Sequence, residues 1–166
     1  MYQFVDQPTN LLSRGSQLVL WAMRGWTRQL NNGRCPPAAL APAFHKLGII
    51  SALPPFHKMM VLLKHHAARD FAFRCLAAPA IGVDEAVLLG VWQDVATGQV
   101  ANAEATLAMI ADEEAAKVII QSMHVASNVF STKDARPDGL AVDTYLPLST
   151  ICPHPNSGSY PVTKGQ

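Results

Sequence analysis

Cysteine and histidine suggest chemistry most directly in this sequence, because together they are the usual ligands of zinc and the usual pair in thiol catalysis. The chain has three cysteines and six histidines. A zinc site usually draws two ligands from one turn, and the close pairs here are His65 with His66 and Cys152 with His154. The first pair points to different sides of a helix, and the second lies in a proline-rich tail. The spacing favours buried thiols and solvated or capping histidines, so we predict no metal ligand and no cofactor.

The standard catalytic signatures are absent from the sequence. It contains no GxGxxG, GxxxxGK[ST], HExxH, GxSxG or CxxC motif. This absence favours a protein that is not an enzyme, but it does not exclude enzymatic activity. The alternative is a small enzyme or metal-binding protein that uses a Cys/His site in the basic N-terminal half, with Cys35 or Cys75 as its thiol.

A second alternative is a DNA-binding helical regulator. Residues 43–51, AFHKLGIIS, resemble the end of a positioning helix, a glycine turn and the start of a recognition helix. Pro54 and Pro55 argue against it, because in that register they fall inside the recognition helix and remove backbone donors. Nucleic acid is therefore not the expected partner.

One candidate binding face lies on the first long helix. Trp21, Arg24 and Arg28 fall near one another on a helical wheel, opposite the apolar stripe. Tryptophan and arginine are enriched at binding hot spots, and arginine binds carboxylates through paired hydrogen bonds. We predict that these three residues contact a second subunit or an acidic protein partner. The competing interpretation is that residues 1–15 cover Trp21 as part of the core.

The element that must organise the fold is the stretch 83–96, VDEAVLLGVWQDVA. Its apolar residues cover so much of a helical wheel that other segments must surround it. Asp84 is a suitable N-cap residue, and Gly98 is a suitable stop. The stretch therefore predicts a central, buried helix over residues 84–97.

Periodicity and capping signals predict five further helices around it. Ser16 and Asp112 are candidate N-caps, and residues 71–82 are expected to form a loop or a short extended crossing, because their residues alternate briefly. The expected helices span residues 16–31, 36–48, 54–69, 100–110 and 112–130.

The predicted fold class is all-α, a single compact domain of about six helices over residues 1–130. Residues 131–166 carry prolines among Ser, Thr, Gly and Asn, which rules out a long helix and indicates an extended C-terminal arm. The apolar side chains in 140–151 lead us to expect that this part docks on the domain or on a second subunit.

Charge and composition limit the kinds of binding partner that we expect. Only 15% of residues are charged, and the mean hydropathy is +0.13, so we expect apolar surface to be hidden in a homo-oligomer, commonly a dimer. Residues 1–80 carry nine Lys and Arg against two Asp, and residues 81–132 carry seven acidic residues against one Lys. The two halves are expected to attract each other within the fold or across a dimer, and a basic face for an anionic partner is the alternative.

These observations together predict a small helical binding or regulatory module. The sequence lacks a signal peptide and an apolar run long enough to span a bilayer, so a cytoplasmic location is expected, without a membrane partner. The ligand and the pathway do not follow from the sequence.

Overall fold

The structure, a computed structural model that describes residues 2–141, is all-α, as the sequence predicts. Apart from three isolated bridges, these residues form no β-structure. The six α-helices are α1 (Arg14–Asn31), α2 (Pro36–Lys46), α3 (Leu53–His66), α4 (Val83–Ala96), α5 (Val100–Leu107) and α6 (Glu113–Ser131). Three short 3-10 helices accompany them: η1 (Tyr2–Phe4), η2 (Thr9–Leu11) and η3 (Ile50–Ala52).

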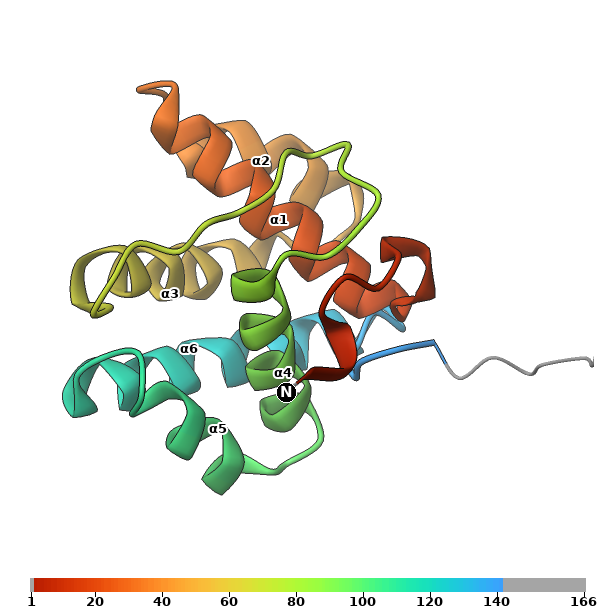
Figure 1. The fold of residues 1–166 in the computed structure, drawn as a ribbon. Coiled ribbons are helices and arrows are strands. Elements are labelled where there is room, and N and C mark those ends of the chain that lie inside the picture. Colours follow the sequence, from red (N-terminus) through yellow and green to blue (C-terminus); the bar gives the residue numbers. More distant parts are fainter. Residues whose placement is uncertain (1, 142–166) are drawn as a thin grey trace, which may run out of the picture.

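The helix α4 lies at the centre of the molecule and contacts α1, α5, α6 and η1 (Figure 1). Its apolar residues are buried on several sides of the helix, which confirms the prediction of a central helix. Gly98 ends the helix in a left-handed conformation with φ of 81°, as expected of a glycine stop.

The helix N-termini were predicted less accurately than the helices themselves. Asp112 caps α6 by accepting a hydrogen bond from the Ala115 amide at 2.8 Å, as predicted. The N-cap of α1 is Ser13 and not Ser16. The N-cap of α4 is Gly82, so the prediction that Asp84 caps this helix was wrong.

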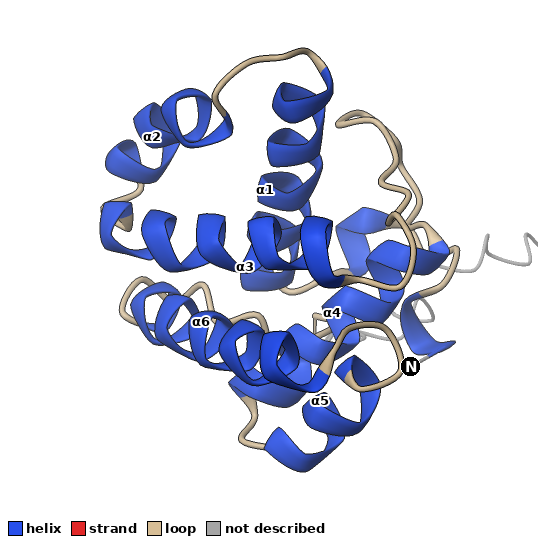
Figure 2. Cartoon of the chain, turned by 90° about the vertical axis from the view of Figure 1, so that its left-hand side faces the viewer, coloured by secondary structure: helices blue, strands red, loops and turns tan. Residues whose placement is uncertain are grey.

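The most extensive contact between two helices joins α3 and α6, which lie side by side (Figure 2). Fully buried aromatic rings link the surrounding helices. The ring of Phe44 in α2 lies 6.0 Å from that of Phe56 in α3 and 6.4 Å from that of Phe130 in α6. Phe130 in turn lies 6.1 Å from Trp92 in α4. These edge-on and tilted contacts join four helices into one core.

After α6 the chain returns to the N-terminal segment. The Ser13 amide donates to the Gly139 carbonyl at 2.9 Å, and the Ala141 amide donates to the Leu11 carbonyl at 2.8 Å. This pairing fixes the beginning of the predicted arm. The rest of the segment for which docking was predicted, residues 142–151, lies outside the described residues.

Three ion pairs join the basic and acidic parts of the chain. Arg24 pairs with Glu85, Arg69 with Asp84, and His66, when protonated, with Asp112. The opposed charges therefore attract each other within the fold, one of the two arrangements that the sequence suggested.

Among the described residues, no helix combines the length and the apolar character needed to cross a membrane.

Candidate functional site

The site is built around residues 67–82, which connect α3 to α4 and which we call the strap. The strap leaves the end of α3, crosses α1 and returns to the first turn of α4 (Figure 1). It has no helix of its own, so its backbone polar groups need partners from outside the segment. Two acidic side chains of α4 and one arginine of α1 supply many of them.

Glu85 and Arg24 form a bidentate ion pair beneath the strap, with two N to O distances of 2.8 Å. Arg24 also donates to the carbonyls of Ala78 and Ala80, at 2.8 and 2.9 Å. Glu85 accepts the backbone amides of Arg74 and Gly82, both at 2.8 Å. Only 3% of the Arg24 side chain and 0% of the Glu85 side chain are exposed. The pair is thus a buried, fully hydrogen-bonded anchor.

Asp84 anchors the first part of the strap. Its carboxylate accepts two hydrogen bonds from the Arg69 guanidinium and one from the Ala72 amide, the last at 2.7 Å. The hydrogen bonds from Arg69 are the main reason that the pKa of Asp84 is lowered, and the Ala72 amide adds to the effect, against the opposing influence of burial. Arg69 also lies 5.6 Å above the ring of Phe71.

The three residues predicted as a binding face do not lie together on the surface. Arg24 is buried in its ion pair, so the expectation that it is exposed was wrong. Arg28 is exposed, and Trp21 is 38% exposed and lines a shallow hollow with Thr9 and Leu76. Trp21 is thus only partly covered by the N-terminal segment. A role for Trp21 and Arg28 in binding a partner stays a prediction.

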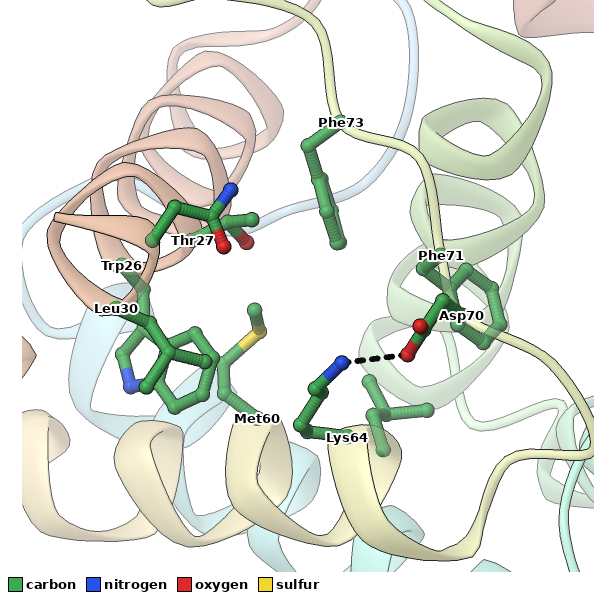
Figure 3. A pocket seen from close by; sticks show the side chains of 10 residues that line it. Trp26, Thr27, Leu30, Met60, Lys64, Asp70, Phe71 and Phe73 are labelled. Atoms are coloured by element: carbon green, nitrogen blue, oxygen red, sulfur yellow. Dashed lines mark hydrogen bonds and ion pairs between the residues drawn. The ribbon is translucent and has the colours of Figure 1, made fainter. Parts of the chain in front are cut away.

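A cavity of about 230 Å³ opens between α1, α3 and the strap, and we call it the aromatic cavity (Figure 3). Figure 3 shows Trp26 and Leu30 on one side, Met60 and Lys64 below, and Phe71 and Phe73 on the strap opposite. The other lining residues are Thr27, Asn31, Leu63 and Asp70. As far as the described residues go, the walls of the cavity contain three aromatic side chains and one ion pair.

That ion pair joins Lys64 of α3 to Asp70 of the strap at 2.5 Å. Both side chains are well exposed, with 47% and 78% of their surfaces accessible. An exposed pair of this kind contributes little to stability, but it links the strap to α3 at the cavity.

Trp26 is held in place from the side of α3. Its indole N–H donates to Nδ1 of His57 at 2.9 Å. Because an indole nitrogen can only donate, Nδ1 of His57 must be unprotonated. Partial burial lowers the pKa of His57, which favours the same neutral form. The Trp26 wall is therefore fixed by a neutral histidine and is not a mobile surface ring.

A second depression of about 340 Å³, which we call the arginine hollow, adjoins the aromatic cavity at Phe73. Thr27, Asn31 and Phe73 line both spaces and so form the partition between them. The hydroxyl oxygen of Thr27 is buried and has no hydrogen-bond partner among the described residues. The remaining residues of the hollow are Arg24, Arg28, Asn32, Arg74, Cys75 and Leu76.

The Cys/His alternative gains no geometric support from the described residues. In this part of the chain, no three His, Cys, Asp or Glu side chains are arranged to hold a metal ion. Cys35 and Cys75 are both exposed free thiols. Cys152 and His154 lie outside the described range.

Comparison with protein families, with curated proteins and with solved structures finds no match to this chain. The function must therefore be argued from the geometry of the site.

Sequence reasoning missed the residues that build this site. The prediction of a loop or short extended crossing over residues 71–82 is confirmed, but it does not show that Phe71 and Phe73 line a cavity or that Glu85 is buried. The alternation of FAFRC at residues 71–75, on which the prediction of an extended crossing rests, also places two phenylalanines on the same side of the segment. A buried acidic residue in the following helix offers such a segment an anchor, but periodicity alone does not show that Glu85 is buried.

Proposed function

We propose that this protein is a small-ligand-binding module, and that its ligand places a single aromatic ring in the aromatic cavity. The observation that carries the proposal is the cavity itself, in which Trp26, Phe71 and Phe73 face an open space of about 230 Å³. Ligand sites are typically concave and lined by apolar and aromatic side chains with few polar groups. The composition of this cavity has that character.

The cavity volume limits the ligand. Drug-sized ligands occupy about 300–1,000 Å³, whereas an apolar cavity of about 150 Å³ holds benzene. At about 230 Å³ the aromatic cavity accommodates one ring with a short substituent. Offset or edge-on packing against Trp26 and the two phenylalanines favours a flat ring over an aliphatic chain of equal size.

The strap gives the module a means of regulation. A ligand in the cavity touches α1 and α3 on one side and the strap on the other, so it binds the closed strap better than an open one. Binding therefore stabilises the strap in its closed position. The surface of the strap, including Arg69 and Arg74, is the part whose accessibility changes with ligand.

The test is a titration of the ¹⁵N-labelled full chain with a neutral aromatic probe, benzyl alcohol, followed by the indole N–H signals. The signal of Trp26 should shift on binding, whereas those of Trp21 and Trp92 should change little, because neither lines the cavity. Phe71→Ala should weaken binding roughly threefold to tenfold, as expected for one lost aromatic contact.

The matched control is Leu76→Ala, which shortens another half-buried strap residue outside the cavity. Its affinity for benzyl alcohol should equal that of the unsubstituted chain. If benzyl alcohol leaves the Trp26 signal unmoved at millimolar concentration, the proposed function is wrong.

Self-association belongs to the same proposal, as the form in which the module acts. The observations that support it are the low charge fraction and exposed apolar side chains such as Trp21 and Met109. Light scattering at micromolar concentration should give a mass near twice 17.9 kDa, and Trp21→Glu should reduce it. A mass near 17.9 kDa at all concentrations would remove this part of the proposal.

A further inference from the structure

The arginine hollow has a charge character that the aromatic cavity lacks. Of the residues that the structure describes, three arginines and no carboxylate line it, although two of the arginines are already paired. Arg24 is neutralised by Glu85, and Arg74 pairs with Asp6 at 3.0 Å. Arg28 forms no ion pair with any described residue, and it is exposed at the hollow. Arg28 is therefore the group with free capacity for an anion.

Beside Arg28, the Thr27 side chain is another polar group without a partner among the described residues, and it lies in the partition between the two spaces. The Thr27 hydroxyl is buried there and makes no hydrogen bond within the described chain. A buried hydroxyl without a partner costs free energy, and a ligand that supplies the missing bond recovers it. Because Thr27 follows Trp26 and precedes Arg28, one turn of α1 presents an aromatic wall, a hydroxyl and a guanidinium in succession.

Resting on the proposed function, we infer that the ligand is an aromatic carboxylate that spans both spaces. Its ring lies against Trp26 in the aromatic cavity, and its carboxylate crosses the partition beside Thr27 and pairs with Arg28 in the hollow. Guanidinium groups bind carboxylates through charge-assisted and often bidentate hydrogen bonds, which gives both affinity and orientation. The Thr27 hydroxyl donates to the same carboxylate.

Phe73 is the residue that decides whether the two spaces communicate. It lines both of them, and its ring points from the strap toward the cavity (Figure 3). A ligand that reaches Arg28 must therefore pass beside this ring or turn it aside. The required movement is a rotation of the Phe73 side chain, because the Ala72 and Arg74 amides on either side of it donate to carboxylates of α4.

The experiment compares carboxylates with matched neutral amides on the full chain. The probes are phenylacetate, 3-phenylpropanoate and 4-phenylbutanoate, each beside its amide, with the Trp26 indole signal as the readout. At one of these chain lengths the carboxylate should bind about tenfold more tightly than the amide, as one charge-assisted contact implies. The preference should shrink as salt is raised, because Arg28 is exposed.

Two variants assign this preference to named residues. Arg28→Gln should abolish the advantage of the carboxylate and leave the affinity of the amide unchanged. Thr27→Val, which conserves volume, should weaken the binding of the carboxylate by a few-fold. The control is Arg34→Gln, since Arg34 is an exposed arginine beyond the end of α1 that does not line the hollow.

The outcomes separate the two proposals. If carboxylates and amides shift the Trp26 signal with equal affinity at every length, the inference is wrong and the aromatic site stands. If Arg34→Gln reduces the preference as much as Arg28→Gln does, the effect is one of overall charge and the inference is again wrong. If no probe moves the signal, the site itself is refuted and the inference with it.

Discussion

The helical core and the strap are held together in different ways. The contact of α3 with α6, and the aromatic rings that join α2 and α4 to it, consist of buried apolar side chains. The strap adds only Ile81 to this core. It is otherwise held largely by ion pairs and by hydrogen bonds to its backbone, from Asp84, Glu85 and Arg24 and from the N-terminal segment. Apolar packing is lost when helices separate, whereas we expect the strap to open while the helices stay packed. The aromatic cavity lies at the boundary between these two regions.

A substitution in the core should have the largest effect on the free energy of unfolding. Phe130 is fully buried and touches the rings of Phe44 and Trp92. Phe130→Ala should lower the free energy of unfolding by about 3–5 kcal/mol, because it removes apolar contacts and leaves a cavity. Urea denaturation measures the change. Val125→Ala on the same helix, at an exposed position, should change the free energy by less than about 0.5 kcal/mol.

The next largest effect should fall on the strap. Glu85→Ala leaves the buried Arg24 without its carboxylate, a change that costs about 3–5 kcal/mol where the charge stays buried. Here the strap can open and admit water, so the global free energy should fall by less than in Phe130→Ala. Trypsin should cleave after Arg69 and Arg74 much faster than in the unsubstituted chain.

Glu114→Ala is the control for this comparison, since Glu114 is an exposed acidic residue paired only with Lys117 among the described residues. It should change neither the stability nor the rate of cleavage. If Glu85→Ala destabilises the whole chain as much as Phe130→Ala without early cleavage of the strap, core and strap form one cooperative unit and the distinction fails.

A smaller effect on the stability of the strap is expected when Asp84 is protonated at low pH. Its pKa in the folded chain lies below that of an unfolded aspartate, so it stabilises the strap at neutral pH. This contribution starts to fall below the unfolded value of about 3.9 and disappears as the pH passes through the lower folded value. The NMR signal of the Ala72 amide, which donates to Asp84, should follow this titration.

Asp84→Asn separates this effect from other acidic groups. The pKa of Asp112 and that of Glu113 are also lowered, but both residues lie at the start of α6. In Asp84→Asn the Ala72 signal should no longer titrate. A signal that still moves with the same midpoint would mean that another group controls the strap.

The smallest effect is expected at the exposed pair of Lys64 and Asp70. Lys64→Ala should change the free energy of unfolding by less than about 1 kcal/mol, because screening and side-chain entropy offset most of an exposed ion pair. Urea denaturation and the affinity for benzyl alcohol should both stay close to those of the unsubstituted chain. A large loss in either would show that this pair holds the strap closed.

The sequence by itself determined the helices. The apolar pattern of residues 83–96, the cap at Asp112 and the stop at Gly98 act within one or two turns of chain, so they can be recognised without tertiary structure. The loop at residues 71–82 follows from the same local signals. Each of these predictions depends on neighbours in sequence, and each was confirmed.

Only the tertiary structure decided which polar residues are buried. Arg24 lies opposite the apolar stripe of α1, so a helical wheel places it in water, but the strap covers that side and Glu85 meets it from 61 residues away. Asp84 has the right type for an N-cap, yet Arg69 and the Ala72 amide take its carboxylate instead. The aromatic cavity likewise combines α1, α3 and the strap. Helical periodicity records which residues share a face, whereas the segment that covers the face depends on long-range packing.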